Sequence, residues 1–211
     1  TFGTINIADV SKVTGTEAEI TSFLAKIASN TISADAAIDI DIYDASSAVT
    51  TVTAANLNTF DDYTLGTIVA PQATTVTGIV SAISEALTSS GISVASDIDA
   101  TFDTIASATD QNVTDINSVI ANTTGTVTGT VTGTPQRMAD ITLSTASGGD
   151  ATKNLTVNAV GSGDLTALNL SEVDTLTLDD TTTLPDSDAD MPPTVDFGSQ
   201  NVTLSGNINI N

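Results

Sequence analysis

The sequence has no cysteine, no histidine and no tryptophan, and only 3% of its 211 residues are aromatic. Without histidine and cysteine, a serine–histidine triad, a thiolate nucleophile and a zinc site built on imidazole or thiolate are all excluded. No glycine-rich loop ends in a lysine, so no phosphate-binding loop is present. A carboxylate pair could hydrolyse glycosides, but sugar subsites usually need aromatic platforms and arginine, and Arg137 is the only arginine. The sequence therefore predicts a protein that is not an enzyme.

Positive charge is also scarce, because 4 lysines and arginines face 26 aspartates and glutamates, giving a formal net charge of −22. A chain with this charge repels nucleic acid and anionic lipid. No apolar run is long enough to span a membrane, so we expect no transmembrane segment. The chain starts at Thr1 without an initiator methionine or a signal peptide, which favours a processed form or a piece of a longer protein.

What the chain does contain is valine, isoleucine, leucine and alanine, alternating with abundant threonine, serine and aspartate. A core of small β-branched residues suits stacked layers better than one globular centre. Internal repetition supports this interpretation. The tripeptide Val-Thr-Gly occurs at Val13, Val76 and Val131, and the first two copies precede segments with apolar residues at helical spacing, EAEITSFLAKIAS and IVSAISEALTSSG.

A constant shift of 59 residues aligns the two halves of the N-terminal region. The shift pairs Tyr43 with Phe102, and Thr64-Leu65-Gly66-Thr67 with Thr123-Thr124-Gly125-Thr126. Each unit is expected to contain a helix, a strand, a shorter helix and a strand. The shorter helices are AANLNTFDDY and QNVTDINSVIANT. We expect Thr53 and Asp110 to cap their N-termini, and Gly66 and Gly125 to end them with a positive φ.

The domain prediction follows from these repeats. Residues 1–134 are expected to hold two helix–strand–helix–strand repeats, at about 13–75 and 76–130, and residues 135–211 a β-rich part. The predicted fold class is an α+β, solenoid-like repeat protein followed by an all-β C-terminal part, either a β-solenoid or sandwich-like. Strands are expected at residues 140–145, 154–160, 165–170, 173–178, 195–197 and 202–210. The Thr-Gly alternation at 123–134 is expected at a sheet edge or a subunit contact.

The strongly acidic composition has two open interpretations. One is a solvated acidic surface suited to salty surroundings, and the other is a set of carboxylates that bind Ca²⁺, which prefers hard oxygen ligands. The first candidate cluster has alternating aspartates, as at the start of an EF-hand loop, but lacks the glycine and the bidentate glutamate of that loop. In the second candidate, Asp39 and Asp41 alternate with isoleucines at 38, 40 and 42, so the aspartates are expected on one face of a strand. This face is either an exposed sheet face with the isoleucines buried behind it, or a ladder of carboxylates on stacked strands, balanced by cations. The candidate ligands are Asp179, Asp180, Asp186, Asp188 and Asp190 in the loop, and Asp39, Asp41, Asp97, Asp99 and Asp103 on the strands.

Several phrases of residues 10–145 resemble a known family. VTGTEAEI, AANLNTFDDYTLGTIVAPQATTVTG, EALTSSGISV and NSVIANTTGTVTGT are similar to the repeats of giant cell-surface proteins of marine cyanobacteria, described as S-layer-like or hemolysin-type calcium-binding proteins. The resemblance implies an extracellular, cell-surface location. The glycine–aspartate nonapeptide of calcium β-rolls is absent from this chain, so the resemblance does not supply calcium ligands through that motif.

These observations predict an extracellular structural protein. We expect a subunit or fragment of a bacterial surface layer, filament or giant surface protein that self-assembles through cation-bridged acidic surfaces and strand edges. Its expected partners are copies of itself and, through Ca²⁺, cell-surface polysaccharide, with no nucleic acid. Two alternatives stay open at this point, a virion tail or fibre protein and a carbohydrate-binding adhesin module.

Overall fold

The computed structural model describes residues 4–45, 48–141, 153–159, 173–178 and 201–204. The chain divides into two compact units, Thr1–Ile98 and Asp99–Asn211. The domain boundary expected at residue 134 was drawn from the sequence repeats. The division into compact units does not test it, so it stays a prediction.

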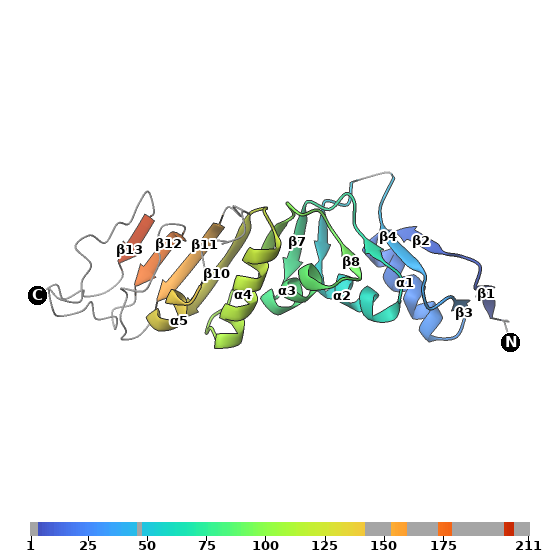
Figure 1. Ribbon diagram of the computed structural model, residues 1–211, viewed down its shortest axis with the longest axis horizontal. Helices are drawn as coiled ribbons and strands as arrows, with labels where there is room; N and C mark the ends of the chain where they lie inside the picture. The colour runs from blue at the N-terminus through green and yellow to red at the C-terminus, as the bar shows by residue number, and fades with distance from the viewer. Residues whose placement is uncertain (1–3, 46–47, 142–152, 160–172, 179–200, 205–211) are drawn as a thin grey trace, which may run out of the picture. The chain divides into compact units, whose positions relative to one another are not determined.

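The first unit alternates strands with three helices, α1 (Glu17–Ala28), α2 (Ala54–Tyr63) and α3 (Val80–Thr88). In Figure 1 these helices follow one another along one side of the unit. Its strands are β1 (Ile5–Ile7), β2 (Lys12–Gly15), β3 (Ile32–Ala34), β4 (Asp39–Ile42), β5 (Thr51–Thr53), β6 (Ile68–Val69), β7 (Thr75–Gly78) and β8 (Ile92–Ser93). Strands β2, β4, β6 and β8 form a parallel sheet in that order, and β1–β3 and β5–β7 are further parallel pairs.

The described residues of the second unit include two helices, α4 (Asp110–Asn122) and α5 (Pro135–Ala139). Its strands β9 (Asp99–Phe102), β10 (Val127–Gly133), β11 (Lys153–Ala159), β12 (Val173–Leu178) and β13 (Asn201–Leu204) pair in chain order, all parallel. Figure 1 shows β10 to β13 side by side.

The predicted fold class is wrong. An α+β protein segregates its helices from a mainly antiparallel sheet, whereas every strand pairing described within these units is parallel and helices connect strands along the chain. The fold is therefore α/β-like. The expected all-β C-terminal part is not shown either, because α5 lies inside it and the described strands β11, β12 and β13 continue the parallel sheet of β10.

The parallel pairing shows that each predicted repeat contains two turns of the chain. Ile40 lies beside Ile68, and Ile68 lies beside Ile92. Successive turns are also joined by hydrogen bonds between a side chain and the backbone, across 28 positions from Thr67 N–H to Asp39 and across 24 positions from the Thr74 hydroxyl to the Thr50 carbonyl oxygen. Each turn thus places a β-branched residue over the equivalent one, which is the stacked core that the small apolar residues predicted. Ile40 and Ile68 are fully buried, as are Val52 and Val76 in the neighbouring pair β5–β7.

The predicted helices are present, with corrections at their ends. Thr16 and Glu19 form a capping box on α1. The N-cap of α4 is Thr109 and not Asp110, and Asn112 completes its capping box. Asp110 lies in the first turn and pairs with Arg137 of α5, with 2.7 Å between its Oδ1 and Nε of the arginine.

The glycines after the short helices do not have the expected positive φ. Helix α2 ends at Tyr63, and its C-cap residue Thr64 has an extended backbone conformation. Among the described glycines, only Gly78 has a positive φ, of 141°. Gly66 has a different reason to be glycine. A Cβ atom at this position would lie 2.5 Å from the carbonyl oxygen of Ile38.

The Thr-Gly segment is a central strand and not a sheet edge. Val127 of β10 pairs with Ala100 of β9 on one side and with Lys153 of β11 on the other. Gly129 allows the close approach of the Phe102 ring, because a Cβ at this glycine would lie 2.3 Å from the ring. The expectation of a sheet edge is therefore wrong for this strand, whereas the alternative of a subunit contact stays a prediction.

Candidate functional site

The acidic face of β4 has the predicted alternation. Ile38, Ile40 and Ile42 are buried, with exposed fractions of 2%, 0% and 0%. Asp39 and Asp41 point to the opposite face and are half-buried. The period of two along a strand separates the apolar and acidic side chains, so the carboxylates are presented on the outside of the stacked core.

Both carboxylates of this face already have partners within the fold. Asp39 accepts a hydrogen bond at its Oδ1 from the backbone N–H of Thr67, at 2.8 Å, and so joins one turn of the chain to the next. Asp41 accepts at Oδ2 from the Lys12 ammonium, at 3.3 Å. Its Oδ1 is buried without a hydrogen-bond partner in the described structure. Both aspartates of this face are therefore hydrogen-bonded within the fold, and Oδ1 of Asp41 is the buried oxygen that lacks a partner in the described structure.

The second predicted rung repeats the main-chain bond. Asp99 on β9 accepts at Oδ1 from the backbone N–H of Thr126, at 2.7 Å, the counterpart of the bond between Asp39 and Thr67. Asp97 and Asp103 are exposed. The aspartates that the sequence pattern placed on one face thus have two environments, and those at the start of β4 and β9 are held by the following turn.

The carboxylate ladder depends on like residues facing each other across strands. In the register of the first unit, Asp39 lies beside Lys12, and Asp41 lies between Thr14 and Val69. No group of three or more acidic side chains close enough to hold a metal ion occurs in the part of the chain that the structure describes. The loop aspartates Asp179, Asp180, Asp186, Asp188 and Asp190 lie outside the described residues. Calcium binding at either cluster stays a prediction.

Glu17 is a bridging carboxylate that the sequence analysis did not identify. Its Oε1 accepts from the backbone N–H of Thr53 at 3.0 Å, from the Thr53 hydroxyl at 2.8 Å and from the Asn56 amide at 3.0 Å. Thr53 is the N-cap of α2, as predicted, but makes no side-chain capping bond of its own. Glu17 of α1 therefore supplies the hydrogen-bond acceptor at the N-terminus of the next helix, where a negative charge is favourable. The signal for this bridge in the sequence was the start of α2, where Thr53 is the N-cap, Asn56 follows three residues later and no acidic residue lies in the first turn.

Several other polar side chains also join consecutive turns. Ser89 donates to Asp61 at 2.6 Å, and Asn58 donates to the carbonyl oxygen of Ala82 at 3.0 Å. Thr64 donates to the carbonyl oxygen of Ile38 at 2.6 Å. Much of the polar content of this chain thus serves the contact between turns, where a buried polar group must be hydrogen-bonded.

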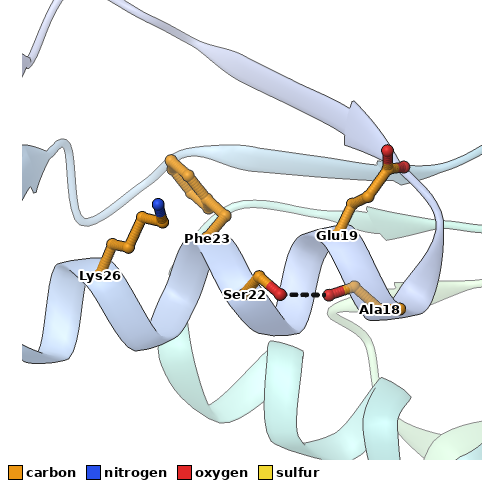
Figure 2. Close-up of a pocket in the computed structure, with 5 residues that line it drawn as sticks. All are labelled: Ala18, Glu19, Ser22, Phe23 and Lys26. Carbon is orange, nitrogen blue, oxygen red and sulfur yellow. Dashed lines mark hydrogen bonds between the residues drawn. The ribbon is translucent and has the colours of Figure 1, made fainter.

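A shallow hollow of about 370 Å³ lies on α1. Its lining residues come from successive turns of this one helix and are Ala18, Glu19, Ser22, Phe23 and Lys26. Figure 2 shows Lys26, Phe23 and Glu19 projecting from the same side of α1, beside the small residues Ala18 and Ser22. The hollow therefore combines an aromatic ring with one charge of each sign.

Replacing Asp39 by alanine is expected to lower the free energy of unfolding by about 1.5–3 kcal/mol, because a hydrogen bond to a charged acceptor is lost and the N–H of Thr67 is left without its partner. Asp62→Ala on the exposed surface of α2 is the matched control and should change stability by about 0.5 kcal/mol or less. Urea unfolding followed by circular dichroism measures both variants. Equal effects of the two substitutions would show that Asp39 does not join the turns.

The chain was compared with known proteins at three levels. No family model matches it, and neither a curated protein nor a solved structure is similar to it. The resemblance of residues 10–145 to cyanobacterial surface proteins therefore stays a prediction. Within the described residues, no helix combines the length and apolar character required to cross a membrane.

Proposed function

We propose that this protein is an extracellular structural component, a subunit or fragment of a bacterial surface layer, filament or giant surface protein. The observation that carries the proposal is the stacking of parallel turns in register, joined by side-chain hydrogen bonds from one turn to the next. A stack of this kind is extended by adding turns and has no need of a central catalytic cleft.

Strand edges support the proposal. In the first unit, the described partner of β2 is β4, and the described partner of β8 is β6. Edge strands present backbone donors and acceptors that can pair with another chain. Edges of this kind suit lateral or end-to-end assembly.

The charge of −22 opposes such assembly in the absence of cations, because like-charged surfaces repel each other. Divalent cations reduce this repulsion and bridge carboxylates, and Ca²⁺ accepts the flexible oxygen coordination that surface aspartates provide. We therefore propose that Ca²⁺ licenses assembly. Bridging to acidic cell-surface polysaccharide is part of the same proposal.

Addition of Ca²⁺ is expected to increase particle size and to raise the thermal unfolding temperature, and EDTA is expected to reverse both changes. Light scattering and circular dichroism measure them. Mg²⁺ at equal concentration and NaCl at equal ionic strength are the controls, since general screening would act in all three salts. If calcium changes neither quantity beyond these controls, the calcium part of the proposal is wrong.

Electron microscopy of the concentrated protein tests the structural role separately. A sheet lattice or a filament would support it. Discrete trimers would instead indicate a virion fibre, and isolated monomers at every concentration and cation condition would contradict an assembling subunit.

A further inference from the structure

We propose that the hollow on α1 is a self-association surface, on which α1 of a second copy of this chain packs antiparallel about a twofold axis next to Ser22 and Phe23. The surface consists of Ala18, Glu19, Ser22, Phe23 and Lys26 and is called the α1 face below. This contact does not depend on the proposed cation bridging.

The α1 face is lined by residues of α1 alone, and all of them except Phe23 are exposed. Ile20 and Leu24 point into the core, with exposed fractions of 1% and 5%. Glu17 is turned toward α2, where it binds Thr53 and Asn56. Phe23, by contrast, is only half-buried although it is one of the few aromatic residues of the chain.

The charges on this face are complementary to those of an antiparallel copy. In an isologous contact, residue i of one copy meets residue j of the other and residue j meets residue i, while positions next to the axis also lie close to their own copies. Pairing two α1 helices antiparallel about a point between residues 22 and 23 places Glu19 opposite Lys26 of the second copy, and Lys26 opposite its Glu19. Two opposite-charge pairs therefore form from a face that carries one charge of each sign.

Both charged groups are available for this pairing. Glu19 uses Oε2 in the capping box, where it accepts from the backbone N–H of Thr16 at 2.9 Å. Lys26 forms no ion pair in the described part of the chain. It is also one of only 4 cationic side chains in the sequence. A lysine seven residues after Glu19 therefore gives the α1 face a positive charge that is rare in this acidic chain.

The shape of the face fits the same arrangement. The twofold places Phe23 of each copy opposite Ser22 of the other. Ala18 and Ser22 are small and lie one helical turn apart, which leaves the hollow of about 370 Å³ beside Phe23. An aromatic ring that enters a hollow lined by small residues is the knob-and-hole contact of packed helices. Because one helix pair buries less surface than a standard interface, the expected dimer is weak.

Cysteine crosslinking tests the geometry directly, because the natural chain contains no cysteine. Ser22→Cys should form a disulfide-linked dimer under mild oxidation, since the twofold brings the two copies of this position together. Thr21→Cys is the control. It is exposed and adjacent in sequence, but it lies on the other side of α1, because consecutive residues differ by about 100° around a helix. Both experiments are run in EDTA, which removes cation bridging.

A second measurement tests the charge pairing in the cysteine-free chain. Sedimentation in EDTA should show a reversible monomer–dimer equilibrium, and Lys26→Gln should weaken it about tenfold by removing both symmetric pairs. Thr21→Glu changes the net charge by the same amount away from the α1 face and should leave the equilibrium almost unchanged. Circular dichroism confirms that the variants are folded.

Preferential crosslinking through residue 22 together with the selective loss caused by Lys26→Gln would support the α1 face as the contact. Equal crosslinking of the two cysteine variants, or a wild-type chain that remains monomeric in EDTA at the highest attainable concentration, would overturn it. Calcium-dependent assembly without this dimer would leave the proposed function standing while this inference fails.

Discussion

Replacing Phe60 by alanine is expected to lower the free energy of unfolding of the first unit by about 3–5 kcal/mol, the range for removing a buried aromatic side chain. Phe60 is 1% exposed and lies on the inward face of α2. The equivalent inward positions carry Ala86 on α3 and Val119 on α4, so Phe60 is the large member of this set. A core built mainly from small β-branched residues has few large side chains that could fill the cavity.

Leu65→Ala is the matched control for this substitution. Leu65 follows the same helix but is 86% exposed, so its truncation should change stability by about 0.5 kcal/mol or less. Urea unfolding followed by circular dichroism compares both variants with the wild-type chain. A Phe60 variant as stable as the Leu65 variant would show that α2 does not pack through this side chain.

Local patterns predicted the helices well because their signals lie within a few residues of each other. The shorter helix expected at AANLNTFDDY is α2, Ala54–Tyr63, and the expected inward isoleucines of β4 are buried. Helical spacing and strand alternation are properties of one element, and they appear in the sequence whatever that element packs against.

In the first unit, pairing between strands was not predicted correctly because it joins residues 24–28 positions apart. Strand β6 has only two residues, Ile68 and Val69, too few to show alternation. The expected units placed one strand after each helix, whereas β3, β4 and β5 follow α1, and β6 and β7 follow α2. The two turns inside each repeat were therefore not separated, and the parallel pairing that makes the fold α/β-like was missed. The expectation of an α+β protein followed from this.

The candidate site shows the same division between local and distant information. The alternation of aspartate with isoleucine placed Asp39 and Asp41 correctly on the outer face of β4. It could not show that Asp39 would bind the backbone N–H of Thr67 or that Glu17 would bind Thr53. Both partners belong to the next turn of the chain. Acidic side chains that looked free for cations in the sequence are thus partly occupied by the fold itself.

Gly66→Ala is expected to destabilise the first unit strongly, by about 1–3 kcal/mol or more, because the added methyl group has no space to enter. A Cβ at this position would lie 2.5 Å from the carbonyl oxygen of Ile38 and 2.8 Å from that of Ala37. Both atoms belong to the backbone of the preceding turn, and the Ile38 carbonyl also accepts the hydroxyl of Thr64 at 2.6 Å. The clash can be relieved only by moving the two turns apart.

Gly133→Ala adds the same methyl group where the neighbour can move. Its Cβ would lie 2.6 Å from Cε of Met138, the flexible end of a long side chain. Urea unfolding should therefore show a smaller loss for Gly133→Ala than for Gly66→Ala. The reverse order would mean that the two turns at Gly66 are not held as closely as the bonds of Thr64 and Asp39 imply. The expected order would show that close contact between turns, rather than a turn conformation, requires glycine at position 66.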